Sequence, residues 1–126
     1  MEQLIKQLEK FAEERDWNQF HTPKNLAMAL SVEVAEIVEI FQWLTTEESV
    51  SFSDDKLAHL EEEIGDVMNY LVSLAGKYGI DPIEAAKKKI RINEKKYPAE
   101  TVRGKGGEVH RILKNSLDNG VFKFSD

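Results

Sequence analysis

The sequence predicts an all-α protein in which four main helices pack as a bundle and an irregular C-terminal tail follows. Apolar residues recur at intervals of three and four in four long segments, at residues 1–16, 23–44, 54–78 and 82–97. Proline, glycine and side chains typical of helix caps separate these segments. Amphipathic helices joined by short loops normally pack as a bundle, which is the architecture expected here.

The length and composition of the chain limit how many domains it can form and which classes of partner it can bind. The chain has 126 residues, enough for one domain, which we place at residues 1–104, with a tail of unknown role at residues 105–126. It has no cysteine, which fits a cytoplasmic location and excludes thiolate metal sites. The net charge of −6 argues against a nucleic-acid polymer as partner, and no apolar run is long enough to suggest a membrane.

The first two helices are joined by a connector rich in aromatic residues. Thr22 followed by Pro23 is a typical helix start, with a hydroxyl at the N-cap and proline at the first helical position. The apolar stripe of the second helix consists of Leu26, Leu30, Ile37, Ile40 and Leu44. Glu33 interrupts this stripe, and an ionisable group there is costly unless it is paired or binds a metal.

The third and fourth helices also carry start and stop signals. Ser53 caps the third helix after a polar loop at residues 45–53, and Gly79 is expected to end it. Asp81 and Pro82 begin the fourth helix, which is the basic region of the chain. Beyond residue 104 we expect a short helix at 109–117, a turn at 119–120 and a short strand or anchoring tail at 121–124.

Two acidic pairs stand at helical spacing, Glu33 with Glu36 and Glu63 with Asp66. Residues three apart share a helix face, so two packed helices would bring four carboxylates together. These would repel unless a cation lay between them, and oxygen ligands suit magnesium or a similar hard cation. The alternative for Glu33 is an ion pair with a lysine or arginine of another helix.

Other side chains fit a nucleotide around such a cation. Trp17, Trp43 and Tyr70 come near the acidic pairs, where a base-stacking pocket would have to lie, although aromatic residues more often belong to the core. Lys89 and Asn93 share one side of the fourth helix and suit phosphate oxygens. A di-iron site is discounted because the Glu-x-x-His motif is absent.

Four segments together resemble a known family. They are Arg15-Asp16-Trp17-x-Gln-Phe-His21-x-Pro-x-Asn25-Leu; Glu33-Val-x-Glu36-x-x-Glu39-x-Phe-Gln-Trp43; Glu62-Glu63-x-x-Asp66-Val-x-x-Tyr70-Leu; and Ile92-Asn93-x-x-x-Tyr97-Pro98. The combination resembles the all-α nucleotide pyrophosphohydrolases, the MazG-like proteins, and looks most similar to their dCTP pyrophosphatase branch. The resemblance covers about residues 4–104.

The resemblance implies roles for three sets of residues. The ligands of Mg²⁺, which Mn²⁺ can replace, are Glu33, Glu36, Glu63 and Asp66. The residues that line the base and sugar pocket are Trp17, His21, Trp43 and Tyr70. The residues that contact phosphates are Lys89, Asn93, Tyr97 and Arg103. Glu36 and Glu63 are the catalytic candidates, because either carboxylate can orient the attacking water or take its proton.

The implied reaction converts a nucleoside triphosphate and water to the monophosphate and diphosphate, with dCTP or a modified dCTP as substrate and a role in cleansing the nucleotide pool. The resemblance also implies a homodimer or homotetramer. One alternative is an enzyme of the same fold that acts on another pyrophosphate, such as dUTP or a phosphoribosyl nucleotide. Another is a non-catalytic acidic helical dimer whose carboxylates are solvated or salt-bridged.

Overall fold

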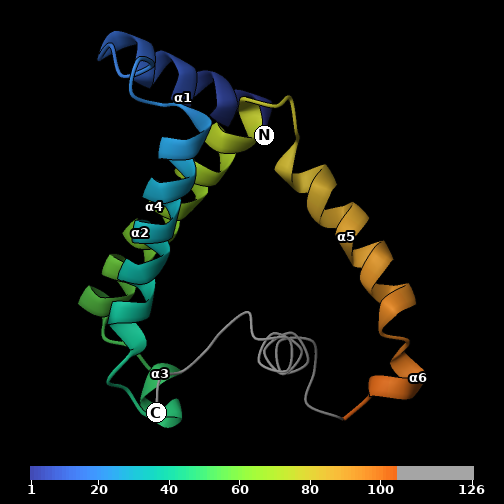
Figure 1. Ribbon diagram of the computed structural model, residues 1–126. Helices are drawn as coiled ribbons and strands as arrows, with labels where there is room; N and C mark the ends of the chain where they lie inside the picture. The colour runs from blue at the N-terminus through green and yellow to red at the C-terminus, as the bar shows by residue number, and fades with distance from the viewer. Residues whose placement is uncertain (105–126) are drawn as a thin grey trace, which may run out of the picture. The chain divides into compact units, whose positions relative to one another are not determined.

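The computed structural model describes residues 1–104, and this part of the chain is helical without a strand (Figure 1). Its helices are α1 (Glu2–Glu14), α2 (Pro23–Phe41), α3 (Thr46–Ser49), α4 (Asp54–Gly76), α5 (Pro82–Lys96) and α6 (Ala99–Val102). The all-α class is therefore confirmed, and the four long helices are those predicted. The helix, turn and strand expected after residue 104 lie outside the described residues.

The chain divides into two compact units, Met1–Ile83 and Glu84–Asp126, which are described separately. In the first unit, α2 and α4 run antiparallel and lie side by side over much of their length (Figure 1). Helix α1 lies across one end of this pair, where α2 begins and α4 ends (Figure 1). Both acidic pairs are carried by α2 and α4, so the packing of these helices determines how the carboxylates meet.

The start of α2 follows the sequence prediction. The Thr22 hydroxyl accepts a hydrogen bond from the backbone N–H of Asn25, at 3.3 Å, and Pro23 occupies the first turn. The Asn25 side chain donates to the backbone carbonyl of Phe20, at 2.9 Å. These contacts join the aromatic connector to the helix that carries Glu33 and Glu36.

The segment expected to be a polar loop at residues 45–53 contains the short helix α3. A capping box explains it: the Thr45 hydroxyl accepts from the Glu48 N–H, and the Glu48 carboxylate accepts from the Thr45 N–H. The rings of Phe41 and Phe52, whose centroids are 5.4 Å apart, hold the two ends of this connection together. A single turn of helix lacks the periodicity that a longer helix shows, so only the cap residues could have predicted it.

The end of α4 differs slightly from the expectation. The helix ends at Gly76 with Lys77 as its cap, not at Gly79. Gly79 lies beyond it in the left-handed region, with φ of 65°, and the next residue, Ile80, donates its N–H to the carbonyl of Ala75, at 3.0 Å. The glycine therefore serves the turn that follows the helix.

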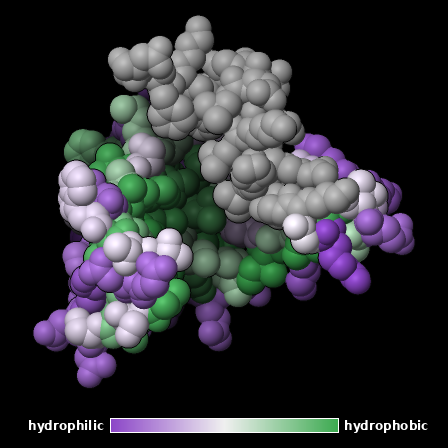
Figure 2. Space-filling model, turned by 90° about the horizontal axis from the view of Figure 1, so that it is seen from below, coloured by the Kyte–Doolittle hydropathy of each residue, from purple (hydrophilic) through white to green (hydrophobic). Residues whose placement is uncertain are grey.

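Few side chains are fully buried in the first unit. Ala12, Leu26 and Val72, one each from α1, α2 and α4, are the buried hydrophobic residues of the described chain. Large apolar side chains on α2 and α4 remain open to solvent, among them Met28, Val32, Val38, Leu57, Ile64 and Met68. Figure 2 shows hydrophobic residues lying on the surface in this way. No helix within residues 1–104 is long and apolar enough to cross a membrane.

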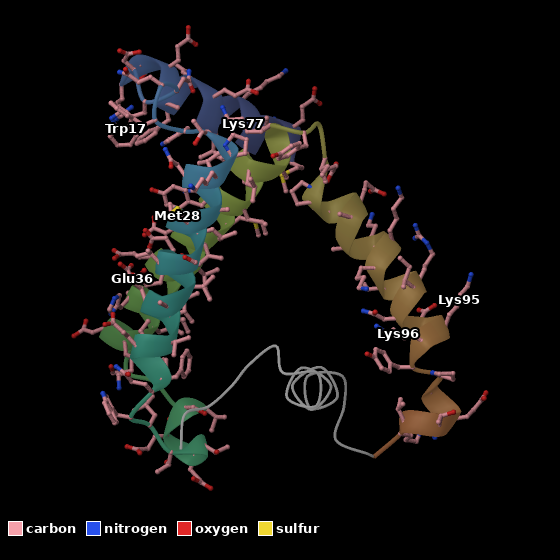
Figure 3. The ribbon with its side chains drawn as sticks, in the orientation of Figure 1. Trp17, Met28, Glu36, Lys77, Lys95 and Lys96 are labelled. Carbon is pink, nitrogen blue, oxygen red and sulfur yellow. The ribbon has the colours of Figure 1, made fainter. Side chains whose placement is uncertain are left out.

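The described part of the second unit consists of most of α5 together with α6. Helix α5 ends in a basic turn with Lys95 and Lys96, both marked in Figure 3. Cations there interact favourably with the carbonyl end of the helix. The chain then passes Pro98 into α6, which is a single helical turn.

Candidate metal and nucleotide site

Three of the four predicted metal ligands meet between α2 and α4. Glu33, Glu36 and Glu63 each offer a carboxylate oxygen, and these oxygens lie within 4.8 Å of one another. We call these three residues the acidic cluster. All three side chains are partly buried, and Glu36 is marked in Figure 3. The arrangement follows from the three-residue spacing on α2 and from the packing of α4 against that face.

Two oxygens of the acidic cluster have no protein partner. Glu33 Oε2 and Glu63 Oε2 are buried and accept no hydrogen bond within the described chain. No lysine or arginine among residues 1–104 forms an ion pair with the cluster. The ion pair considered as an alternative for Glu33 is therefore not formed in this part of the protein. Buried polar atoms normally have partners, so these oxygens require an explanation.

The surroundings of Glu33 disfavour its charge. Burial, followed by hydrogen bonding with Glu36 and the negative charges of Glu36, Asp66 and Glu63, raises the pKa of Glu33 from 4.5 to about 7. A carboxyl group in this position is easily neutralised by a proton. A cation placed among the same oxygens would neutralise it without protonation.

Glu63 is shifted in the same direction. Hydrogen bonding with Glu36, then burial and the charge of Glu36, raises the pKa of Glu63, and His59 opposes the shift. The side chain of Glu63 is 13% exposed, and its Oε1 atom lies 3.3 Å from His59 Nε2, one turn earlier on α4. The imidazole thus faces one oxygen of Glu63 and leaves the other for the interior of the cluster.

Asp66, the fourth predicted ligand, lies one turn after Glu63 on α4 and is exposed. Its charge contributes to the raised pKa values of Glu33 and Glu63, so it lies near the cluster. It is not among the three residues whose oxygens meet within 4.8 Å. Its role as a ligand therefore stays a prediction.

The acidic cluster fits a hard divalent cation. Its donors are carboxylate oxygens, two of them buried without a partner, and such ligands suit Mg²⁺, Mn²⁺ or Ca²⁺. Two basic groups of the described chain lie nearby: His59, which is 59% exposed and 3.3 Å from Glu63, and Lys56, which lines a cavity with Glu36 and Glu63 but forms no ion pair with either. Ionised oxygens that face one another without a counter-charge are costly, and bound metal would remove that cost.

An aromatic cavity lies in the same unit and brings together several predicted pocket residues. Its volume is about 420 Å³, within the range of small-molecule sites. We call it the aromatic cavity. The residues that line it are Leu4, Gln7, Leu8, Phe11, Ala12, Trp17, His21, Asp66, Asn69, Tyr70 and Ser73. Asp66 therefore belongs to the cavity wall and also acts electrostatically on the acidic cluster.

Trp17 is held in place by its aromatic neighbours. Its ring meets those of Phe11 and His21 edge to face, with centroid distances of 5.6 Å and 6.1 Å. The backbone carbonyl of Trp17 accepts a hydrogen bond from the His21 N–H, at 3.1 Å. Figure 3 shows Trp17 at the α1 end of the unit. Trp17, His21 and Tyr70 thus share one cavity, as expected of a pocket for a base.

The structure does not bring Trp43 to this cavity. Trp43 follows the end of α2 farther from α1, and it is 86% exposed. It therefore stays a predicted pocket residue without a neighbour in the aromatic cavity. The sequence motif places Trp43 close to Glu36 along the chain, but it does not determine the direction that a side chain takes beyond a helix end.

The predicted phosphate-binding residues lie in the second unit. Lys89, Asn93 and Tyr97 recur every four residues, the first two on α5 and Tyr97 directly after it. The Tyr97 N–H donates to the Asn93 carbonyl at 2.7 Å, and Lys96 lies over the Tyr97 ring. Arg103 is exposed beyond α6. Their roles toward phosphate remain predictions.

Sequence reasoning missed two groups of residues near the site. Lys56 and His59 line a further cavity of about 370 Å³ together with Glu36, Glu39 and Glu63. The signal for His59 was available, since it stands four residues before Glu63 on a helix. Gln7 and Asn69 line the aromatic cavity, and only the crossing of α1 and α4 reveals that they share it.

The structure is an all-helical fold with a carboxylate cluster between two antiparallel helices, which is the arrangement of a candidate metal-binding protein. Comparison with known proteins identifies the family to which it belongs. The model of the MazG-like family matches residues 28–108. A crystal structure of a pyrophosphatase from Archaeoglobus fulgidus is similar, with a TM-score of 0.73 and 46% sequence identity, over 78% of this chain and 92% of that one. This chain therefore belongs to the MazG-like family.

Curated relatives carry the name dCTP pyrophosphatase 1. The protein of that name from Homo sapiens is 46% identical over 96 residues, which are 75% of this chain and 56% of the relative. The one from Rattus norvegicus is 40% identical over 110 residues, or 86% of this chain and 65% of the relative. The chain thus spans less than two thirds of the length of these relatives.

Proposed function

We propose that this protein is a magnesium-dependent nucleoside triphosphate pyrophosphohydrolase, which converts a deoxynucleoside triphosphate and water to the monophosphate and diphosphate. The observation that carries the proposal is the pair of buried, unpartnered oxygens on Glu33 and Glu63. Their arrangement suits a divalent cation, and the aromatic cavity offers a place for a base. The names of its relatives, dCTP pyrophosphatase 1 and pyrophosphatase, support the same reaction.

In this proposal Glu33, Glu36 and Glu63 hold the divalent cation, with Asp66 as a fourth ligand. When bound, the cation would neutralise phosphate charge and, as a Lewis acid, polarise a phosphoryl oxygen. Oxygen ligands favour Mg²⁺, and Mn²⁺ prefers a similar set. Asp66 is exposed and lines the aromatic cavity, so its carboxylate can bind the cation while it also faces the bound substrate.

The acidic cluster also supplies the groups that act on water. A carboxylate oxygen of Glu36 or Glu63 orients the water for in-line attack on the α-phosphorus and accepts its proton. The bond from the α-phosphorus to the bridging oxygen then breaks, and diphosphate leaves.

The other predicted residues bind the rest of the substrate. Trp17 and Tyr70 stack on the base, and His21 lies beside them in the aromatic cavity. Trp43, which lies outside the aromatic cavity, stays a predicted contact of the base. The predicted contacts of the phosphates are Lys89, Asn93, Tyr97 and Arg103. We place the substrate among deoxycytidine triphosphates, modified forms included, and the protein in the cytoplasm, where it would cleanse the nucleotide pool.

A panel of substrates tests this function. Purified protein is given dCTP, 5-methyl-dCTP, dUTP, dTTP, dATP, dGTP and the ribonucleotides, with Mg²⁺ or with a chelator, and diphosphate release is measured. We expect release only with the metal, and fastest from the deoxycytidine compounds. Preference for dUTP would assign a different substrate to the same fold. Silence across the panel would favour the non-catalytic dimer.

Replacing Trp17 with alanine is expected to raise KM for the preferred nucleotide about 10- to 100-fold, because stacking on an aromatic ring contributes about 1–3 kcal/mol. The kcat value should change much less, since the ring touches the base and not the reacting phosphate. Steady-state kinetics on Trp17→Ala and Trp17→Phe measure this. Phe20→Ala is the matched control, because Phe20 lies in the same connector and is 59% exposed. Equal KM values for wild type and Trp17→Ala would contradict the pocket.

We also propose that the protein is a homodimer or a homotetramer. Apolar side chains on α2 and α4 remain exposed, including Val32, Val38 and Ile64, and a second copy would cover them. Sedimentation equilibrium at micromolar concentration is expected to give at least twice the chain mass of 14.4 kDa. A monomer at that concentration would contradict the assembly without affecting the metal site.

A further inference from the structure

We propose that His59 is a positioning residue of the metal site, whose imidazole holds the Glu63 carboxylate so that one of its oxygens is kept for the divalent cation. The inference rests on the proposed function, which places the cation among Glu33, Glu36 and Glu63. It goes beyond that function because His59 is neither a predicted metal ligand nor a predicted contact of the nucleotide.

The contact between His59 and Glu63 follows from their spacing on one helix. The two residues lie four apart on α4, and side chains at this spacing are neighbours on a helix surface. His59 Nε2 lies 3.3 Å from Glu63 Oε1, which is near the long end of hydrogen-bond distances. An imidazole that carries its proton on Nε2 donates it to this oxygen. The carboxylate is 13% exposed and the imidazole 59%, so the contact is made at the open edge of the acidic cluster.

The two oxygens of Glu63 have different surroundings. Oε1 faces His59, whereas Oε2 is buried and accepts no hydrogen bond within the described chain. The terminal torsion of a glutamate is broad, so an unrestrained carboxylate samples many orientations. A donor at Oε1 restricts this rotation and keeps Oε2 in the interior of the cluster. A ligand that is already oriented loses less conformational entropy when the cation binds, which raises the affinity.

The other neighbours of Glu63 cannot take this role. Glu36 is itself a proposed ligand, so its oxygens are needed by the cation. Lys56 lines the same 370 Å³ cavity as His59, but within residues 1–104 it forms no ion pair with the cluster. Its ammonium group instead lies 5.3 Å from the centre of the Phe52 ring. In this part of the chain, His59 is therefore the side chain outside the cluster that can hold Glu63.

A positioning role and a solvated surface histidine have opposite consequences for the metal. Partners that hold a ligating side chain typically contribute about 10- to 100-fold to metal affinity, so their removal weakens binding. A basic group that touches no ligand can act on the cation only through its charge, which repels the metal. Its removal would leave the affinity unchanged or raise it. The sign of the change in affinity thus distinguishes the two roles.

Binding of Mn²⁺ to the purified full chain, without nucleotide, tests the inference, with free Mn²⁺ measured by electron paramagnetic resonance. His59→Ala and His59→Leu lack the donor and are expected to weaken binding about 10- to 100-fold. His59→Gln should keep most of the wild-type affinity, because its amide supplies an N–H donor. Lys56→Ala is the matched control, since it removes a basic group from the same cavity, and it should not weaken binding. Circular dichroism should show an unchanged helical fold for all four variants.

Equal or tighter Mn²⁺ binding by His59→Ala and His59→Leu would overturn the inference. A loss in His59→Gln as large as in His59→Ala would do the same, because a donor at this position would then not be sufficient. If His59→Ala does not fold, His59→Leu decides, since it keeps more of the side-chain volume. A wild type that binds no Mn²⁺ would refute both the inference and the metal site. Binding that depends on His59, without diphosphate release from any nucleotide, would refute the proposed function alone.

Discussion

Replacing Glu63 with glutamine is expected to lower kcat/KM for the nucleotide substrate by at least about 10³-fold, while the protein stays folded. Glu63 shows two features expected of a metal ligand in a protein without its metal: a buried oxygen without a partner, and a pKa raised by hydrogen bonding with Glu36, by burial and by neighbouring carboxylates. Glutamine keeps the shape of the side chain but removes its charge and its ability to accept a proton. Both metal binding and the activation of water should therefore fail together.

Glu62→Gln is the control, because it makes the same chemical change one residue earlier on α4, at an exposed position. It should keep near-wild-type kcat/KM. Circular dichroism and thermal unfolding should give Glu63→Gln a metal-free stability equal to or above that of wild type, since the substitution relieves repulsion within the cluster. Wild-type turnover by Glu63→Gln would contradict the assignment of Glu63 as ligand and catalytic group.

Without metal, the free energy of unfolding is expected to fall as pH rises from 4.5 through about 7, by about 3 kcal/mol from Glu33. The folded carboxyl titrates at about 7 and the unfolded one near 4.5, so the folded state binds more protons within this window. Below the window both states are protonated and the contribution is fully retained. Above it both are ionised, and the folded protein bears the cost of a buried charge.

Urea unfolding at pH 5 and pH 8 measures this effect. The decline should be smaller in Glu33→Gln than in wild type, and Glu62→Gln should behave as wild type. Saturating Mg²⁺ should stabilise wild type at pH 8 and remove most of its decline, because the cation replaces the proton among the same oxygens. The same decline in Glu33→Gln and wild type would show that Glu33 is not the group responsible.

The four long helices could be predicted because each has a periodic apolar face, and α2, α4 and α5 also have a recognisable start. Thr22 and Ser53 cap their helices as the sequence indicates. Helix α3 was missed because one helical turn has no periodicity, and only the reciprocal bonds of Thr45 and Glu48 mark it. The sequence also could not predict how few side chains are fully buried within one chain, because an apolar stripe looks the same whether its own chain or a second copy covers it.

The acidic cluster was predictable in part. Spacing and the interrupted stripe identified Glu33, Glu36 and Glu63, since helical geometry fixes which residues share a face. The same spacing could not determine that Asp66 lies at the edge of the cluster, or that Trp43 lies outside the aromatic cavity. Gln7 and Asn69 belong to helices whose crossing depends on packing between distant segments. No local pattern encodes that crossing.

In the proposed function the acidic cluster holds a divalent cation, which the protein uses to cleave between the α- and β-phosphates. Phosphorus NMR of dCTP incubated with the protein, with Mg²⁺ or with a chelator, tests this most directly. We expect dCMP and diphosphate as the only products, formed only with Mg²⁺. Formation of dCDP and phosphate, or an equal rate in the chelator, would contradict it.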